Sequence, residues 1–264
     1  IAKERIDIDK VAILTKVLSM MDLTTLEGSD NDRKVMNLCK KAISLKDIGL
    51  GVNSTAAVCV YPVFAETAKK ALEGTGVKIA AVAGGFPSGQ MPLHLRVQEV
   101  MWTVVHGADE IDMVISRGRM LSGDYDFIFE EVKEHKLACG RAHLKVILET
   151  GELLEPSIIK KASEIAIEAG ADFIKTSTGK IQPAATLEAT YVMLKVIKEH
   201  FDKTGIKIGF KPAGGISTAE QAIDYYLLVK NILGEEFLTP NLFRYGASRL
   251  FDTVLEEINK LQSI

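Results

Sequence analysis

The stretch FIKTSTGK, residues 173–180, reads as a short buried β-strand that carries a lysine, Lys175, and runs into a glycine turn. The stretch IGFKPAGG, residues 208–215, repeats this arrangement with Lys211. A segment with helix-like apolar spacing and charged faces separates the two. Near-continuous apolar strands that alternate with amphipathic helices are typical of a parallel sheet covered by helices. The pair therefore predicts an α/β protein.

Eight apolar runs of this kind occur along the chain. They are MMDLTTL (20–26), TAAVCVYP (55–62), KIAAVAGGFP (78–87), EIDMVIS (110–116), LKVILET (144–150), FIKTSTG (173–179), IGFKPAGG (208–215) and FRYGAS (243–248). Amphipathic helices are predicted between or after them at residues 33–44, 93–105, 127–138, 155–169, 186–200, 219–233 and 248–261. Eight strand-helix units favour a single (β/α)8 TIM barrel domain over residues 1–264, with a short N-terminal helical segment before the first strand. An open doubly wound sheet is the alternative.

Composition excludes several classes of function. The chain has 32 basic and 35 acidic residues and a net charge of -3, which gives no bulk attraction to nucleic acid or to a membrane surface. The longest apolar stretches are shorter than the roughly 20 residues that span a bilayer. The three cysteines form no CxxC pair, and the five histidines form no HxH or HExxH pattern, so we expect no disulfide framework and no metal site. A cytoplasmic location fits this cysteine usage.

Lysines inside buried strands indicate amine chemistry. A lysine becomes a nucleophile only when burial or a neighbouring cation lowers its pKa, and two such lysines on consecutive strands are expected to depress each other's pKa. Lys175 and Lys211 therefore predict a Schiff base with a carbonyl substrate. Asp112, within another strand, is a candidate acid/base group. The alternative is that Asp112 or Asp22 neutralises each lysine in a purely structural ion pair.

Three further residues in the strand runs are open to two interpretations. Asp22 either caps a strand end or forms hydrogen bonds within the site. Lys145 either bonds inside the barrel or extends its head to the strand end. Cys59 is interpreted as a core residue, since a buried cysteine is more often a small hydrophobe than a nucleophile.

Glycine-rich loops after the sixth, seventh and eighth strands predict a phosphate site. Barrels commonly bind phosphate with the loops after strands 7 and 8 and a helix N-terminus. The alternative is that these glycines merely form tight turns. The predicted substrate- and phosphate-binding residues are Asp22, Thr178, Gly179, Lys180, Gly214, Gly215, Ser217, Gly246 and Ser248.

Motifs along most of the chain carry a family resemblance. MDLTTL, AAVCVYP, GADEID, LKVILETGEL, GADFIKTSTGK, GFKPAGG and FRYGAS occur in this order between Met21 and Ser248. Together they resemble deoxyribose-phosphate aldolase, a class I aldolase family of barrel fold. Arg249 departs from the pattern, because some members carry a second serine or threonine after the residue that matches Ser248.

The resemblance implies reversible cleavage of 2-deoxy-D-ribose 5-phosphate to acetaldehyde and D-glyceraldehyde 3-phosphate, without a metal or another cofactor. By motif, Lys175 is similar to the Schiff-base lysine of the family. Lys211 is similar to the second lysine that lowers the first one's pKa, and Asp112 to the acid/base carboxylate. The implied partners are small phosphosugar and aldehyde substrates, and the resemblance also suggests a homodimer. The alternatives are a transaldolase or other phosphosugar aldolase, and a non-catalytic phosphosugar-binding barrel.

Overall fold

The computed structural model describes residues 8–263 and contains one parallel eight-stranded sheet. The strands are β1 (Met21–Thr24), β2 (Ala57–Val60), β3 (Lys78–Ala83), β4 (Glu110–Val114), β5 (His143–Ile147), β6 (Phe173–Lys175), β7 (Gly209–Lys211) and β8 (Tyr245–Ala247). Seven of the eight runs predicted as strands contain one of them, and β5 begins at His143, one residue before its predicted run. β1 through β7 follow one another in the sheet in chain order, and β8 pairs with β1.

The two edges of the sheet, β7 and β8, meet and close it into a barrel. Parallel bridges join Phe210 to Phe243 and Ala213 to Gly246. Three backbone hydrogen bonds of 2.8–3.0 Å cross this seam, including one from the Phe210 N–H to the Leu242 carbonyl. The predicted (β/α)8 barrel is therefore confirmed, and the open sheet is wrong.

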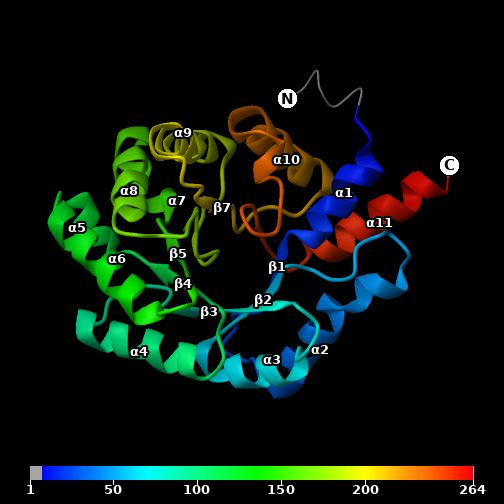
Figure 1. Ribbon diagram of the computed structural model, residues 1–264, viewed down its shortest axis with the longest axis horizontal. Helices are drawn as coiled ribbons and strands as arrows, with labels where there is room; N and C mark the ends of the chain where they lie inside the picture. Colours follow the sequence, from blue (N-terminus) through cyan, green and yellow to red (C-terminus); the bar gives the residue numbers. More distant parts are fainter. Residues whose placement is uncertain (1–7, 264) are drawn as a thin grey trace.

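Helices surround the strands (Figure 1). They are α1 (Lys10–Ser19), α2 (Asp32–Ala42), α3 (Ala65–Ala71), α4 (Leu93–Val105), α5 (Arg117–Leu121), α6 (Tyr125–Cys139), α7 (Thr150–Leu153), α8 (Pro156–Glu168), α9 (Leu187–Thr204), α10 (Ala219–Leu233) and α11 (Leu250–Gln262), with short 3-10 turns η2 (Ser44–Asp47), η3 (Pro62–Phe64) and η4 (Glu235–Phe237). The first helix, α1, precedes β1 and packs beside α11. Over residues 8–263, every helix is too short or too polar to traverse a bilayer.

Local capping explains why several of these helices begin where they do. The Thr218 hydroxyl accepts a hydrogen bond from the Gln221 backbone N–H, and the Gln221 side-chain oxygen accepts one from the Thr218 backbone N–H, so the two residues form the capping box that starts α10. The Thr186 hydroxyl caps α9 in a similar way. Pro156 stands in the first turn of α8, where its missing N–H has no bond to lose. The seven-residue α3 was not predicted, because it spans too few residues to show helical periodicity.

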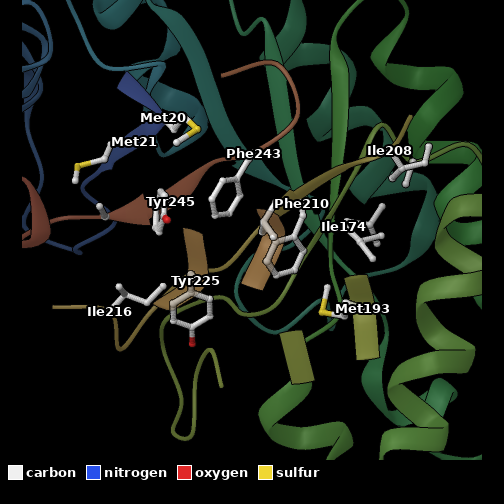
Figure 2. Packing of buried hydrophobic residues seen from close by; sticks show 14 of the residues in the cluster. Met20, Met21, Ile174, Met193, Ile208, Phe210, Ile216, Tyr225, Phe243 and Tyr245 are labelled. Carbon is white, nitrogen blue, oxygen red and sulfur yellow. The ribbon is translucent and has the colours of Figure 1, made fainter. Parts of the chain in front are cut away.

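The outer face of the closing seam is an aromatic layer under α10. Figure 2 shows Phe210, Phe243 and Tyr245 in succession, with centroid distances of 6.3 Å and 4.7 Å between neighbouring rings. The Tyr245 hydroxyl donates to the Ala222 carbonyl at 2.8 Å, which ties β8 to α10. These contacts bury the seam from outside, so the barrel does not depend on its few bridging hydrogen bonds alone.

Inside the barrel, the Phe173 ring on β6 packs directly against β7 at Gly209, where a side chain would collide with it. Gly209 stands opposite Phe173 in the strand register, and a Cβ atom at Gly209 would lie 2.3–2.5 Å from the Phe173 ring. Real Cβ atoms do not approach a ring so closely, so any side chain at this position must displace Phe173.

We expect Gly209→Ala to lower the free energy of unfolding by about 1–3 kcal/mol, because it overpacks the barrel interior. Urea-induced unfolding measures this change. Gly118→Ala is the matched control: it lies in α5, where a Cβ would meet nothing within 4 Å, and we expect stability to be unchanged or raised by up to about 1 kcal/mol. Equal stability of Gly209→Ala and the wild type would contradict the described packing of Phe173.

Candidate active site

Seven ionisable side chains converge inside the barrel. Four are cationic and three are carboxylates, and each is at most 3% exposed. They come from β1, β4, β5, β6 and β7 and from the residue before β8. The seven are Asp22, Glu110, Asp112, Lys145, Lys175, Lys211 and Arg244, and we call them the interior charge cluster.

Asp112 is the centre of this cluster. Its Oδ2 atom accepts hydrogen bonds from Lys175 Nζ and Lys211 Nζ, each at 2.7 Å. Its Oδ1 atom lies 3.2 Å from Lys145 Nζ. Lys211 has a second carboxylate, since its Nζ atom lies 2.6 Å from Asp22 Oδ2. Lys175, by contrast, pairs within the cluster with Asp112, a carboxylate that two other lysines share.

The floor of the cluster is formed by Arg244, Glu110 and Phe173. Arg244 donates from Nη2 to Glu110 Oε1 at 2.8 Å and from Nη1 to Asp22 Oδ1 at 2.6 Å. Lys145 donates to the other Glu110 oxygen. Both cations lie over the Phe173 ring, with Arg244 at 5.8 Å and Lys145 at 5.9 Å from its centroid. The guanidinium and Glu110 thus support the lysines from below.

The two strand lysines of the predicted Schiff-base pair differ in their electrostatics. Burial lowers the pKa of Lys175 below its ordinary 10.5, the ion pair with Asp112 opposes this, and the charge of Lys211 lowers it further. Burial acts on Lys211 in the same way, but Asp112 and Asp22 together raise its pKa above 10.5. The prediction that the lysines depress each other's pKa is therefore wrong for Lys211, which has two carboxylate partners.

The carboxylates of the cluster are held ionised. Burial alone would raise the pKa of Asp112, but Lys145, Lys175 and Lys211 bring it well below its ordinary 3.8. The cations Lys211 and Arg244 likewise lower the pKa of Asp22 against its burial. Asp112 is thus a charged acceptor next to three amines.

The opposite side of the barrel interior is apolar. Leu26, Ala57, Cys59, Ala80 and Val82 form a small cluster there, with Tyr61 and Phe86 packed against it. Cys59 Sγ lies 4.0 Å from Asp112 Oδ2, and burial raises the pKa of the thiol. The side chain interpreted as a core residue therefore packs as a protonated thiol beside the charges.

A cavity of about 540 Å³ opens above Lys175, between the loops that follow β1, β6, β7 and β8. Seven predicted site residues line it: Lys175, Thr178, Gly179, Lys180, Gly214, Gly246 and Ser248. Asp112, Lys211 and Asp22 lie beneath, linked to Lys175 through the contacts described above. Gly215 lines a separate hollow of about 230 Å³ beside α10, and the Ser217 amide donates to Gln221 Oε1 at 2.8 Å. Neither residue lines the cavity, so their phosphate role stays a prediction.

Backbone geometry brings the cavity loops together. Gly214 has a φ of +76°, and a Cβ there would lie 2.8 Å from Ala184 Cβ. Only glycine accepts this conformation and this close approach without strain. Glu149, buried at the N-terminus of α7, accepts bonds from the Thr178 amide at 3.1 Å and the Thr178 hydroxyl at 2.5 Å. It does so from a left-handed backbone, with φ of +58°.

Lys180 bridges two loops at the mouth of the cavity. Its Nζ atom donates to the Leu26 carbonyl at 2.5 Å and lies 3.1 Å from Glu27 Oε1. Arg249 lines the same cavity at the N-terminal end of α11. Four more cavity residues come from α2 and were not predicted from sequence: Lys34, Asn37, Leu38 and Lys41.

Sequence reasoning also missed Glu110 and Arg244 on the floor. Glu110 is the first residue of its strand and Arg244 precedes one. Charged residues at such positions usually indicate solvent-exposed strand ends. The signal was the period of two: Glu110 stands two residues before Asp112, and Arg244 two before Gly246, so each points into the barrel with its neighbour.

The arrangement supports one kind of chemistry in particular. Lys175 is a buried amine of lowered pKa that opens onto a cavity, and its neighbour Asp112 is an ionised acceptor. Such an amine adds to carbonyl carbon, and such a carboxylate moves protons.

Comparison with known proteins agrees with the fold and indicates a family of aldolases. Residues 16–226 match the model of the DeoC/LacD family of aldolases. A mouse protein named deoxyribose-phosphate aldolase is 46% identical over 262 residues, which cover 94% of this chain and 81% of the mouse protein. The human protein of the same name is 45% identical over the same shares.

Solved structures show the same architecture. QR15, described as an aldolase, superposes with a TM-score of 0.75 at 30% identity, covering 94% of this chain and 98% of its own. A tetrameric deoxyribose phosphate aldolase from Aeropyrum pernix has a TM-score of 0.72 at 24% identity, covering 96% and 98%, and shares the fold. The family model and the mammalian relatives each span most of this protein, and the chain therefore belongs to the DeoC/LacD family of aldolases.

Proposed function

We propose that this aldolase reversibly cleaves 2-deoxy-D-ribose 5-phosphate to acetaldehyde and D-glyceraldehyde 3-phosphate through a Schiff base at Lys175. The names of the mouse and human relatives support the substrate. One observation carries the mechanism. Among the three lysines of the interior charge cluster, Lys175 is the one that lines the cavity and the one whose pKa is lowered.

The first half of the reaction is the activation of the sugar. Neutral Lys175 adds to the C1 aldehyde of the open-chain substrate, and loss of water gives an iminium. The iminium withdraws electrons from C2 more strongly than the aldehyde does, so the C2–C3 bond is weakened.

Bond cleavage then needs a base for the C3 hydroxyl. Asp112 is ionised and lies 2.7 Å from Lys175 Nζ, close enough to accept this proton directly or through a water. Lys211 shares the same Asp112 oxygen and supplies a positive charge beside it. Departure of glyceraldehyde 3-phosphate leaves an enamine, whose protonation and hydrolysis release acetaldehyde and free Lys175.

The phosphate is proposed to lie at the mouth of the cavity. Lys180 brings an ammonium there, and Gly179, Gly214, Gly246 and Ser248 line the same space. The N-terminal end of α11 follows Ser248, and a helix N-terminus favours an anion. Binding energy from this remote group orients the reacting carbons over Lys175.

The cytoplasmic location and the homodimer inferred from the sequence remain proposals. The Aeropyrum pernix relative is described as tetrameric. A sedimentation measurement of the purified chain distinguishes a monomer, dimer and tetramer.

We expect acetaldehyde and sodium borohydride together to add one reduced two-carbon group to the peptide that contains Lys175. Reduction traps the Schiff base as a stable secondary amine, and mass spectrometry of intact protein and peptides locates it. Lys175→Ala removes the adduct, whereas Lys198→Ala, at a surface ion pair on α9, retains it. Adducts spread over surface lysines, or no adduct while the phosphosugar still binds, would support a binding barrel instead. Trapping by dihydroxyacetone phosphate rather than acetaldehyde would favour another aldolase.

A second test concerns the phosphate. Lys180→Met is expected to lower kcat/KM for 2-deoxy-D-ribose 5-phosphate about tenfold or more, because a charge-assisted contact contributes about 1.5–3 kcal/mol. Activity toward unphosphorylated 2-deoxy-D-ribose should not change. Lys198→Met, outside the cavity, is the control. An equal loss with both sugars would mean that Lys180 acts only by joining the two loops at the mouth.

A further inference from the structure

The interior charge cluster holds more cations than anions. Asp22, Glu110 and Asp112 face three lysines and Arg244, and all seven side chains are buried. A buried charge without a compensating partner costs several kcal/mol, so the cluster is most stable when positive and negative charges are equal in number. Three carboxylates balance three cations, and one amine is left to be neutral.

Arg244 cannot be that neutral group. A guanidinium does not lose its proton in proteins, whereas an amine does. Arg244 pairs with both oxygens of Glu110, at 2.8 Å and 3.2 Å, and with Asp22 Oδ1 at 2.6 Å. Its positive charge therefore compensates the negative charge of Glu110, and part of that of Asp22, at every accessible pH.

The lysines must share the charge that remains. Lys211 donates hydrogen bonds to Asp22 Oδ2 and Asp112 Oδ2. Lys145 donates to Glu110 and to Asp112 Oδ1. Lys175 donates to Asp112 Oδ2, an oxygen that also accepts a hydrogen bond from Lys211. Of the three amines, Lys175 has the fewest carboxylate contacts within the cluster, and it is the one next to the cavity.

We propose that Arg244 is a positioning residue that keeps the Lys175 amine unprotonated by permanently occupying carboxylate charge on the barrel floor. This rests on the Schiff-base role of Lys175 proposed above. Arg244 does not line the cavity, and the floor contacts with Glu110 and Phe173 place it below Lys175 rather than against the substrate.

The other groups that face Lys175 do not supply this charge. Cys59 on β2 is a protonated thiol, and β3 contributes Ala80 and Val82 to the interior. At the mouth, Lys180 and Glu27 pair with each other at 3.1 Å. The direction of the Lys175 pKa, which is lowered, agrees with the count of charges.

The test is the pH profile of trapping at Lys175 by acetaldehyde and cyanoborohydride, measured on the full chain by peptide mass spectrometry. Arg244→Gln keeps hydrogen-bond donors for Asp22 and Glu110 but removes the charge, so a carboxylate is released to the lysines and Lys175 is protonated more readily. We expect the acid limb of the profile to move to higher pH by about one unit or more, which is a tenfold loss of adduct at a pH below the limb.

Two further variants separate charge from structure. Arg244→Lys replaces the guanidinium with an amine that can itself lose its proton, so its acid limb is expected to lie between those of the wild type and Arg244→Gln. The double variant Glu110→Gln with Arg244→Gln removes one charge of each sign and is expected to return the limb toward its wild-type pH. If Arg244 had a purely structural role, all variants would lower the amount of folded protein or the rate of trapping. The acid limb would then not move to higher pH in Arg244→Gln and return in the double variant.

The outcomes are distinct from those of the proposed function. No adduct in the wild type at any pH overturns the Schiff-base role, and this inference with it. A wild-type adduct whose acid limb is unmoved by Arg244→Gln overturns this inference alone. If Arg244→Gln does not fold, Glu110→Gln serves instead: loss of a carboxylate with Arg244 retained should move the limb to lower pH, and an unmoved limb overturns the inference.

Discussion

Charge held inside a barrel that excludes water is the constraint on which the site depends. Seven ionisable groups of the interior cluster stay buried because their ion pairs offset the loss of hydration, and each pair is needed to keep the others compensated. Asp112 illustrates this, since it contacts three lysines at once. A reactive amine next to the cavity is thus a property of the whole set rather than of Lys175 alone.

Barrel closure makes this set of contacts available. Lys211 and Asp22 are 189 residues apart in the chain, and Arg244 and Asp22 are 222 apart. Both pairs form only because β8 lies between β7 and β1. The aromatic layer of Phe210 and Phe243 under α10 therefore supports the chemistry from the outer face of the sheet (Figure 2).

The sequence predicted the order of strands and helices well, because each strand-helix unit carries its own local pattern. The helices at 93–105 and 219–233 have the bounds that were predicted. Lys175, Lys211 and Asp112 were predicted as site residues because a charge inside an apolar strand is conspicuous, and the structure places them in one cluster. The floor residues Glu110 and Arg244 were not, because their importance comes from partners on distant strands, which local patterns do not reveal. The α2 residues at the cavity depend likewise on how a helix packs.

The left-handed backbone of Glu149 limits how position 149 can vary in evolution. Glycine would relax this conformation by about 1–2 kcal/mol, but it would leave the buried Thr178 amide and hydroxyl without their acceptor, at a cost of about 1–3 kcal/mol for each. Aspartate accepts the left-handed backbone more readily, but its shorter side chain would not reach the Thr178 amide and hydroxyl as glutamate does. Selection for an ordered loop at the cavity is therefore expected to retain glutamate at position 149 despite its unfavourable backbone conformation. Replacement by glycine and replacement by a shorter acid are both disfavoured.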